Sequence, residues 1–586
     1  MSLLVWLPLN GNLENKGLSD ATFSAYASDI YLSVANDGKI SPQCYQRTAA
    51  AGNGFRSSKT FKLDGDVSMC CWAYISDAPE TSANGLITNH NHKDGSGFGI
   101  TVKRQDENDF RISCNEGRSG SDRTYHTYYG TTNIKDAWHH LALTHNQAKK
   151  ELKLYVDGVC EKTVSGKNFA VGDNPFDLFV WSTGYIHSLD YHAIGKLNDV
   201  RLYDNCLSEK ELSEIAKGMV AHYKLNGSGG KNLITQMRAG RSMTNINKYS
   251  LLADYSANTD TYAWFDVSPE LDPAKIYTLS FDVTNFPGEE GEAWTWNLYN
   301  NSNYAIWVDH DGHYVYTFTP NPDGPHTGFL FDDGGRPAPK GKVTFSNFKI
   351  EEGEFESPWY PHQTDSLYSI LFNNTEYDCS GYEHHASYYG TPVFSGDSPI
   401  GASSMTFTGS NAVVCGRGPM VTDELTVNLW VYMSDWSKLS NSYRIMSCTE
   451  GGGWNFENVG HFIVYAGGAY IRASGTLTSL PSGWHMLTGT WDGYQSKIYA
   501  DGILKASSSA LASKTKISYN NNNGIFIGVE AGGSATTPGS PYFTGKISDV
   551  RIYGKALSEQ DIKELYQVPI SISNKGEVLA KQLMEV

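Results

Sequence analysis

The middle third of the chain places tryptophans among polar side chains, a combination suited to binding sugars. Sugar rings have apolar CH faces that lie on aromatic rings, while their hydroxyl groups need fixed polar partners. The candidate stacking residues are Trp264, Trp294, Trp296 and Trp307, and the candidate hydroxyl partners are Asn297, Asn301, Asp309, Asp332 and Arg336. Trp294 and Trp296 share a face if their stretch is a strand, so the rings form either a stacking surface or part of a core.

One further tryptophan stands in a glycine-rich stretch of the last third, residues 450–458 with the sequence EGGGWNFEN. Such a stretch places Trp454 either at a loop tip, where a glycan could reach it, or at a hinge over the core. We include Trp454 among the candidate glycan-binding residues.

Residues able to catalyse a reaction form no recognisable motif in the sequence. There is no His-Glu-x-x-His zinc motif, no Walker loop and no Gly-x-Ser-x-Gly nucleophile elbow. The acidic cluster of Glu351, Glu352, Glu354 and Glu356 follows a predicted strand and is expected to be a solvated edge. The sequence therefore predicts a binding protein with no catalytic residue.

A duplication organises the elements that must position these residues. Residues 195–209, GKLNDVRLYDNCLSE, are repeated at residues 545–559 as GKISDVRIYGKALSE, with nine of fifteen positions identical. Upstream, residues 138–158 correspond to residues 484–502, and residues 67–77 to residues 425–435. A repeat of this strength indicates two copies of one folding unit.

The repeated segments predict a β-rich unit that closes with a short helix. In LKLYVDG, apolar residues alternate along residues 152–156, as in a half-buried strand. The Asp-Gly pairs at 157–158 and 501–502 supply the positive φ angles of a tight hairpin. Ser208 with Glu211, and Ser558 with Asp561, then resemble capping boxes at a helix start. The recurring aromatic residues are expected to be core, namely Trp72, Trp138, Tyr203, Trp430, Trp484 and Tyr553.

These segments resemble the laminin-G-like and concanavalin-A-like lectin superfamily. The resemblance lies in W-H-x-L, Y-x-D-G, G-K-[IL]-x-D-V-R-[IL]-Y and a closing L-S-E, and it covers most of residues 1–218 and about 365–568. It implies an all-β chain of jelly-roll sandwiches, each with two antiparallel sheets, and it does not by itself imply a ligand. Glycosidases of this superfamily use Glu-x-Asp-x-Glu or Glu-x-Asp-x-x-Glu, and neither spacing occurs here.

Calcium is the one cofactor that this resemblance suggests, because laminin-G-like domains often hold Ca²⁺ through loop carboxylates and carbonyls. Asp94, Asp122 and Asp492 are the available loop carboxylates. No regular loop identifies them as ligands, so no metal site is assigned.

The segment between the copies reads as a separate β-sandwich, residues 228–362. Residues 276–286, IYTLSFDVTNF, alternate as a strand with one wet face. The closing residues 345–361 resemble the end of the jelly-roll carbohydrate-binding modules common in phage structural proteins. The resulting division is a lectin-like domain at 1–218, the middle module at 228–362, a second lectin-like domain at 363–568 and a tail at 569–586.

The connection of the middle module remains open at this point, and the tail has a structure signal of its own. Residues 220–227, VAHYKLNG, echo residues 3–11, LLVWLPLNG, so the middle module is either inserted after a first strand at 219–227 or simply in line. In the tail, Asn574-Lys575-Gly576 is a turn signal between two alternating runs, which predicts a hairpin over residues 569–586.

Charge and cysteine content narrow the classes of partner and compartment. The formal net charge of −17 argues against nucleic acid as a partner. The sequence has no run of eighteen apolar residues, so no membrane insertion is expected. The start of the chain lacks a positive leader and a clear cleavage site, so no signal peptide is expected. The nine cysteines do not repeat with the domains, which favours free thiols and folding in a reducing host cytoplasm.

Together these features predict a non-catalytic bacteriophage virion protein, in the tail, the baseplate or a head decoration, that binds glycans for host adhesion. Its expected partners are glycans of a bacterial cell surface or mucus and other virion proteins, with many copies in a homo-oligomer or array. One alternative is a purely structural decoration or assembly protein. The other is a glycoside hydrolase of concanavalin-A-like fold.

Overall fold

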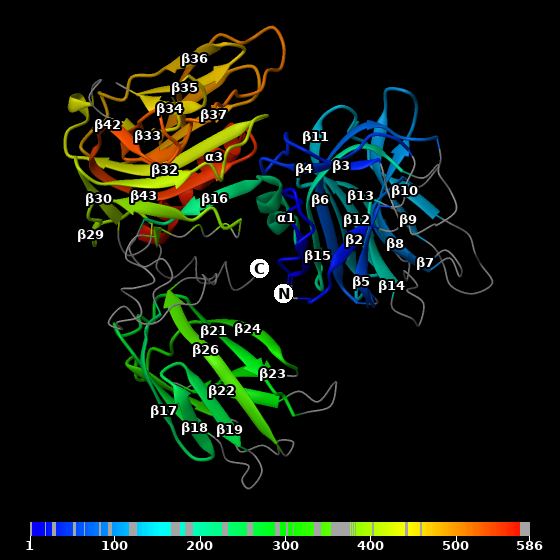
Figure 1. Ribbon diagram of the computed structural model, residues 1–586, viewed down its shortest axis with the longest axis vertical. Helices are drawn as coiled ribbons and strands as arrows, with labels where there is room; N and C mark the ends of the chain where they lie inside the picture. The colour runs from blue at the N-terminus through cyan, green and yellow to red at the C-terminus, as the bar shows by residue number, and fades with distance from the viewer. Residues whose placement is uncertain are drawn as a thin grey trace.

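Three β-rich units make up the protein, shown by a computed structural model as two sandwiches side by side with a third below (Figure 1). It describes residues 3–574 apart from 18, 26–30, 51–53, 64, 81–83, 92–95, 117–125, 166–175, 182–191, 226–231, 255–261, 288–293, 300–302, 309, 333–340, 353–374, 377, 379, 381, 401–403, 440–443, 450 and 458–459. The described strands pair in antiparallel sheets, which confirms the all-β, jelly-roll class predicted from the sequence.

The first sandwich packs two sheets face to face around a core of apolar side chains. One sheet has the order β13-β12-β11-β6-β15-β4-β3, with β1 paired to β15. Its strands are β1 (Leu3–Leu7), β3 (Leu32–Ala35), β4 (Cys44–Arg47), β6 (Val67–Asp77), β11 (Trp138–Asn146), β12 (Glu151–Val156), β13 (Val159–Ser165) and β15 (Ile194–Tyr203). The other sheet, in the order β10-β9-β8-β7-β14-β5-β2, has β2 (Phe23–Ala25), β5 (Phe55–Phe61), β7 (Asn84–Asn91), β8 (Ser96–Arg104), β9 (Phe110–Glu116), β10 (His126–Tyr129) and β14 (Phe176–Val180).

The second sandwich repeats this plan. Its first sheet, β29-β30-β43-β32-β37-β38-β39, has β29 (Val393–Ser395), β30 (Ser404–Thr408), β32 (Leu425–Met433), β37 (Gly483–Trp491), β38 (Ser496–Ala500), β39 (Ile503–Ser507) and β43 (Thr544–Tyr553). Its second sheet, β27-β28-β31-β40-β33-β34-β35-β36, has β27 (Thr375–Glu376), β28 (Ala386–Tyr389), β31 (Ala412–Gly416), β33 (Arg444–Ser447), β34 (Trp454–Glu457), β35 (His461–Ala466), β36 (Ala469–Ser474) and β40 (Ile525–Ile527). The short 3₁₀ helix η1 (Trp436–Lys438) and the hairpin β41 (Val529–Ala531) and β42 (Pro538–Tyr542) complete it.

A strand that precedes the middle module belongs to this second sandwich. β16 (Met219–Tyr223) pairs with β43, and the pairing repeats that of β1 with β15. In both pairs the register shifts at the second residue, between Leu3 and Val5 and between Met219 and Ala221. The echo between residues 3–11 and 220–227 thus corresponds to two equivalent strands, and the middle module follows β16 in the chain.

The middle module packs two sheets around an aromatic core that includes the stacked rings of Phe265 and Phe331. One sheet, β17-β20-β25-β22-β23, has β17 (Ile234–Ala239), β20 (Tyr262–Val267), β22 (Trp294–Tyr299), β23 (Asn303–Val308) and β25 (Gly328–Asp332). The other, β18-β19-β26-β21-β24, has β18 (Met243–Asn247), β19 (Ser250–Asp254), β21 (Tyr277–Thr284), β24 (Gly312–Phe318) and β26 (Lys342–Glu352).

The outer face of β21 differs from the prediction. Thr278 and Ser280 were expected to be wet but are buried. Ser280 lies opposite Lys349 and Thr278 opposite Glu351, and these two charged residues are also buried and form an ion pair of 2.8 Å. Glu351 is therefore part of a buried polar layer instead of a solvated edge, while Glu352 pairs with Lys275 at 3.0 Å. Glu354 and Glu356 lie outside the described residues.

The Asp-Gly motif makes the predicted tight turn in both copies. Asp157 and Asp501 have φ angles of 52° and 54°, and the glycines after them have 83° and 74°. Each aspartate also accepts a bond from the histidine of the W-H motif, at 2.8 Å from His139 and 2.5 Å from His485. Burial alone would lower the pKa of His485, but the bond to Asp501 raises it above its ordinary value. The motif therefore closes a hairpin and ties it to the neighbouring strand.

The D-V-R motif is also structural. Asp199 and Asp549 have left-handed φ angles of 55° and 52°, at a bulge where the register of β15 and β43 shifts. Each carboxylate accepts a hydrogen bond from the arginine two residues further along the chain. It accepts another from a side chain of the paired strand. That strand supplies the indole of Trp6 at 2.6 Å in the first copy and the imidazole of His222 at 2.7 Å in the second.

Helices close both copies. α1 (Glu209–Ala216) begins at Ser208 with the predicted capping box, and its buried Leu212 packs on the outer side of the sheet beside Tyr203. α3 (Glu559–Asn574) begins with reciprocal bonds between Ser558 and Asp561. The predicted tail hairpin is wrong for residues 569–574, which continue α3 although Pro569 in its interior has no backbone NH to donate. Residues 575–586 lie outside the described part.

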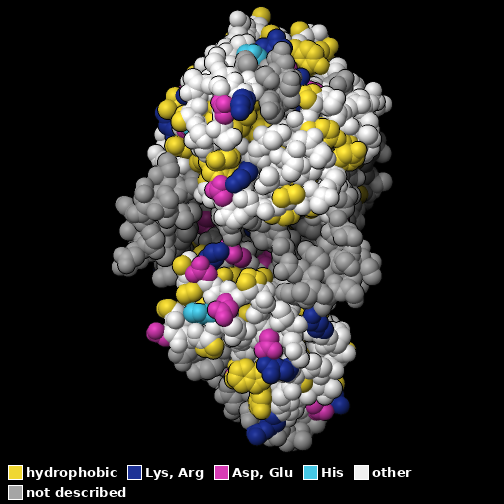
Figure 2. Space-filling model, turned by 90° about the vertical axis from the view of Figure 1, so that its left-hand side faces the viewer, with side chains coloured by type: hydrophobic (Ala, Val, Ile, Leu, Met, Phe, Trp, Pro, Cys, Tyr) yellow, Lys and Arg dark blue, Asp and Glu magenta, His cyan; other side chains and the backbone are white. Residues whose placement is uncertain are grey.

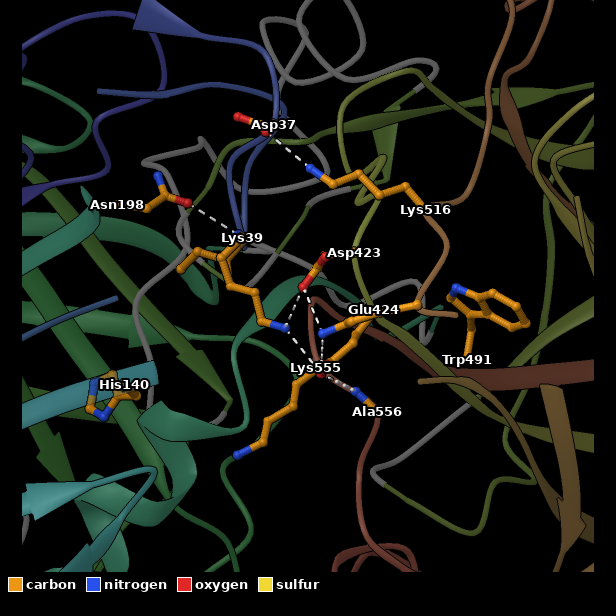
Figure 3. A network of polar contacts seen from close by, with 12 residues as sticks. Asp37, Lys39, His140, Asn198, Asp423, Glu424, Trp491, Lys516, Lys555 and Ala556 are labelled. Atoms are coloured by element: carbon orange, nitrogen blue, oxygen red, sulfur yellow. Dashed lines mark hydrogen bonds and ion pairs between the residues drawn. The ribbon is translucent and has the colours of Figure 1, made fainter. Parts of the chain in front are cut away.

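The two sandwiches are packed against each other through a shared core and a buried charge network. Trp6 of the first contacts Tyr382 of the second edge to face, with ring centroids 5.2 Å apart. The ammonium of Lys39, almost fully buried, lies 3.0 Å from Glu424 and 3.8 Å from Asp423 (Figure 3). Both carboxylates also contact Lys514, so opposite charges alternate through the interface.

Described cysteines carry free thiols, as the sequence predicted: Cys44, Cys70, Cys71, Cys114, Cys160, Cys206, Cys415 and Cys448. All but Cys160 and Cys206 are buried, and Cys379 lies outside the described residues. Burial raises the pKa of Cys44 and Cys70 to about 12, so neither is a reactive thiolate. Among the described helices, none has the length and apolar character needed to cross a membrane.

Candidate glycan-binding face

Two of the predicted stacking residues are exposed on the middle module. Trp264 in β20 is 46% exposed and Trp307 in β23 is 56% exposed. Their chain neighbours Ala263 and Phe265, and Ile306 and Val308, are buried in the core. Because side chains alternate along a strand, both indoles project from the outer side of the sheet β17-β20-β25-β22-β23. We call this side the tryptophan face.

Polar groups lie beside the first of these rings. Arg238 of β17 stands opposite Trp264, and its guanidinium binds the Asp266 carboxylate at 2.7 Å. On the other side Leu330 of β25 stands opposite Trp264. Trp264 is therefore flanked by an apolar side chain and by a fixed donor and acceptor pair, as a sugar ring requires. Figure 2 shows exposed hydrophobic side chains beside adjacent basic and acidic ones on this lower unit.

The second ring lies further along the same face. Trp264 pairs across the sheet with Leu330, Leu330 with Tyr299, and Tyr299 with Asn303. Asn303 stands four residues before Trp307 in β23. Three strand spacings and four residues correspond to about 20 Å across a flat sheet. The backbone NH of Trp307 donates to the hydroxyl of Tyr316, which fixes the strand at this end. The two rings are thus separated by the length of an extended oligosaccharide, and one monosaccharide cannot reach both.

The remaining predicted residues of this module are only partly described. The backbone pairs Trp294 with Val308 and Trp296 with Ile306, while their side chains lie outside the described part, as does that of Asn297. Asp309, Arg336 and Asn301 lie wholly outside it. Asp332, at the end of β25, is partly exposed.

Trp454 is not a binding residue in this structure. Its side chain is fully buried in the second sandwich, where it begins β34 and packs near Phe462 with ring centroids 6.5 Å apart. Gly453, with a φ of 71°, turns the chain so that the indole enters the core. The hinge interpretation of EGGGWNFEN is the one that the structure supports.

Metal ligands do not gather in the part of the chain that the structure describes, where no group of three or more His, Cys, Asp or Glu side chains could hold an ion. Asp492 caps a turn, accepting from the backbone NH groups of Tyr494 and Gln495 at 2.9 and 2.7 Å. Asp94 and Asp122 lie outside the described residues.

Three members of the tryptophan face were not singled out from the sequence, namely Arg238, Asp266 and Leu330. The signal for Asp266 was present, because it stands two residues after Trp264 and so on the same face of a strand. Arg238 and Leu330 depend on which strands neighbour β20, and this order is set by tertiary packing.

The fold and these surfaces define a protein built from tandem lectin-like β-sandwiches around a third sandwich. Residues 49–213 and 407–563 each match the laminin-G family model described as the concanavalin A-like lectin/glucanases superfamily, and together they cover more than half of the chain. The chain belongs to this superfamily. It matches none of the curated proteins with which it was compared.

Solved structures with some likeness are distant. Domain 4 of AbnA, an arabinanase from Geobacillus stearothermophilus, in complex with arabinotriose, is 16% identical, with 37% of this chain and 98% of that chain covered and a TM-score of 0.28. The Ruminococcus gnavus IT-sialidase CBM40 bound to α2,3-sialyllactose is 13% identical, with coverages of 26% and 84% and a TM-score of 0.23. The botulinum neurotoxin serotype G binding domain is 10% identical, with coverages of 61% and 100% and a TM-score of 0.28. Nothing is inferred about function from likenesses of this size.

Proposed function

We propose that the protein binds glycans and that the tryptophan face of the middle module is one binding surface. The observation that carries this proposal is the exposure of Trp264 and Trp307 on one side of one sheet. The exposed parts of the two indoles gain nothing from folding, and their flat apolar faces are free to stack on a ligand. The ion pair of Arg238 and Asp266 beside Trp264 supplies polar partners that are already oriented.

Each such site is expected to be weak. Sugar hydroxyls must lose bound water on binding, and a shallow sheet face buries only one side of the ligand. Many copies held together would raise the effective affinity by 100-fold or more, roughly, without a new contact. We therefore propose that the protein acts as a homo-oligomer or as part of an array.

As the setting for this array we propose a bacteriophage particle, in its tail, baseplate or head decoration, with glycans of the bacterial surface or mucus as ligands. The support is the modular sequence, in which two lectin-like copies accompany a module whose closing residues 345–361 resemble the end of jelly-roll carbohydrate-binding modules common in phage structural proteins. The free thiols of the described cysteines agree with folding in a host cytoplasm. Proteomics of purified particles should find the chain, and its absence from particles of a producing strain would remove this setting.

We further propose that binding is not followed by cleavage. Glycoside hydrolysis needs one carboxyl group free to donate a proton and a second free to attack or to activate water. Three largely buried carboxylates of the second sandwich are instead engaged by cations, Glu457 by Arg472, Glu530 by Arg444 and Asp549 by Arg551. A fourth, Glu376, accepts from the Tyr388 hydroxyl and the backbone NH of Leu225. The Arg551 and His222 side chains hold the pKa of Asp549 well below its usual range, although burial alone would raise it.

A glycan array probed with the full-length protein tests the binding proposal. Trp264→Ala and Trp307→Ala should each lower the apparent affinity of the best-bound glycan about tenfold, since one ring contact contributes on the order of 1 kcal/mol. Ile246→Ala is the matched control, because Ile246 is an exposed apolar residue of the module's other sheet, in β18. Equal binding by all four proteins would contradict the proposal.

The same glycans also test for cleavage. Incubation with the full-length protein should release no new reducing ends above the buffer control. Hydrolysis that persists in the Trp264→Ala and Trp307→Ala variants would show a catalytic site elsewhere in the chain.

A further inference from the structure

An edge strand of the second sandwich presents an aromatic ring and a guanidinium side by side. Tyr470 and Arg472 of β36 alternate with Ile471 and Ala473, which pack on the core. The Tyr470 side chain is 42% exposed and that of Arg472 is 47% exposed. Two residues along a strand separate the two groups by about 7 Å, roughly the width of one sugar ring with its hydroxyls.

The guanidinium is fixed by a carboxylate that is itself nine-tenths buried. Nε and Nη2 of Arg472 donate to Oε1 of Glu457 in β34 at 2.9 and 2.7 Å. The Glu457 side chain is only 10% exposed. No described residue contacts Nη1 of Arg472 or Oε2 of Glu457 within hydrogen-bond distance. One donor and one acceptor are therefore oriented and left for another molecule, as two neighbouring hydroxyl groups would need.

The aromatic ring is held just as firmly. Tyr465 of β35 packs against Tyr470 edge to face, with ring centroids 4.9 Å apart. The Tyr470 hydroxyl accepts from the backbone NH of Gly451 at 3.1 Å. The ring therefore does not need to be ordered on binding, which lowers the entropic cost of stacking.

Buried polar groups continue along the same face of the sheet, where Asn455 of β34 lies across Ile463 of β35 from Arg472. Asn455 of β34 is 1% exposed, and its Oδ1 has no hydrogen-bond partner among the described residues. Its Nδ2 donates to the Thr449 hydroxyl at 3.3 Å, and that hydroxyl donates to Glu530 at 3.2 Å. Glu530 in turn pairs with Arg444 of β33. An unsatisfied buried amide oxygen is costly for folding alone and is more readily explained at a site that takes up a polar ligand or its water.

The first sandwich supplies an internal comparison, because its sheet has the same strand order. Its register shifts between Gly85 and Ile87 as that of the second copy shifts between Arg444 and Met446. By this alignment Gly85 occupies the place of Arg444, and Thr101 the place of Glu457. Thr101 is bonded to Ser113 at 2.7 Å, so the fold closes this face with two hydroxyls and does not require the charges.

From these observations we infer a second glycan site on the second sandwich, formed by Tyr470, Arg472, Glu457 and Asn455 and named the β36 site. Its ligand class is a neutral sugar with an apolar ring face next to two adjacent hydroxyls. Neutrality follows from the charges, because Arg472 is matched by Glu457 and Arg444 by Glu530. The inference shares its ligand class with the proposed function but does not depend on the tryptophan face.

The experiment uses the full-length chain carrying Trp264→Ala and Trp307→Ala, so that the tryptophan face no longer contributes. The probes are immobilised neutral oligosaccharides of gluco, galacto and manno configuration, with sialylated ones for comparison. Residual binding to a neutral glycan is expected, and Tyr470→Ala or Arg472→Ala added to this background should weaken it tenfold or more, roughly, the effect of losing a hydrogen bond to a charged group. Arg111→Ala is the matched control, because Arg111 on β9 of the first sandwich also binds a carboxylate, that of Asp109, through Nε and Nη2.

Each outcome decides between the two sites. Loss of residual binding in the Tyr470 and Arg472 variants but not in Arg111→Ala supports the β36 site. Residual binding that is unchanged by both substitutions overturns it. A background protein that binds nothing also overturns it but leaves the tryptophan face standing, provided that the unsubstituted chain binds. A preference for sialylated probes would contradict the neutral ligand class.

Discussion

At the scale of single residues, His140 of β11 is buried in a way that makes the fold sensitive to acid. Both of its ring nitrogens lack a hydrogen-bond partner among the described residues, and the ring lies edge to face with Trp72, centroids 5.5 Å apart. Burial lowers the pKa of His140 to about 4. The unfolded chain, in which the pKa is ordinary, therefore binds the proton more readily than the folded one.

Replacing this histidine tests the effect. The stability that neutral His140 contributes is complete above pH 6.5 and falls as the pH drops toward 4, by about 3 kcal/mol in total. His140→Phe should remove this loss, so its urea midpoint should fall less than that of the unsubstituted chain between pH 7 and pH 4. Parallel pH profiles for the two proteins would show that the ring is hydrated or paired and that this description is wrong.

The tryptophans show what the sequence could and could not predict at this scale. A window around Trp264 or Trp454 contains polar and aromatic residues in both cases, and its composition does not distinguish an outer face from a core. The outcome depends on the partner sheet, which covers Trp454 completely and leaves Trp264 46% exposed. Recurrence was the better guide, since five of the six recurring aromatic residues are buried as expected, and the sixth, Trp484, is half-buried.

At the scale of elements, the two copies of the Asp-Gly hairpin differ in what surrounds the glycine. A Cβ on Gly158 would come within 2.7 Å of the Cα of Ser213 in α1. On Gly502 it would meet Lys563 of α3 at 3.4 Å, an ordinary contact. The same motif therefore carries a packing constraint in the first copy that it lacks in the second.

This difference predicts unequal effects for one substitution. Gly502→Ala should cost about 1 kcal/mol, the strain of a left-handed φ for alanine. Gly158→Ala should cost about 2 kcal/mol or more, because α1 must also move. Urea unfolding of the two variants measures both, and equal losses would indicate that α1 does not pack on this hairpin in solution.

Elements with local signals were predictable and elements with competing signals were not. The capping boxes at Ser208 and Ser558 depend on residues three apart in sequence, and both form. The alternation in residues 570–573 covers only four positions and is compatible with a strand, yet it lies next to a helix that has already begun. The continuation of that helix decides the conformation.

At the scale of the whole molecule, the buried charges between the sandwiches join them into one unit. Burial alone would raise the pKa of Glu424, but Lys39 and Lys514 hold it below its ordinary value. Lys39 also lies over the ring of Trp72, with its ammonium 5.5 Å from the centroid. Sequence could not predict this contact, because Lys39 and Glu424 belong to different copies and no repeated motif contains them.

Removing one partner should weaken the junction. Glu424→Ala leaves Lys39 buried beside one fewer carboxylate and should cost about 3 kcal/mol or more. Lys516→Ala, which breaks the more exposed pair with Asp37, should cost less than about 1 kcal/mol. Calorimetric unfolding compares them, with small-angle scattering to detect separated sandwiches in Glu424→Ala. Identical behaviour of the two variants would mean that the buried network does not hold the sandwiches together.

Glycan binding by an exposed aromatic sheet face is the claim on which the functional account rests. Its most direct test is a crystal structure of the full-length chain with the glycan that gives the strongest array response. The account predicts sugar rings stacked on Trp264 or Trp307, with hydroxyls within hydrogen-bond distance of Arg238 or Asp266. A glycan bound elsewhere with both indoles left bare would contradict it.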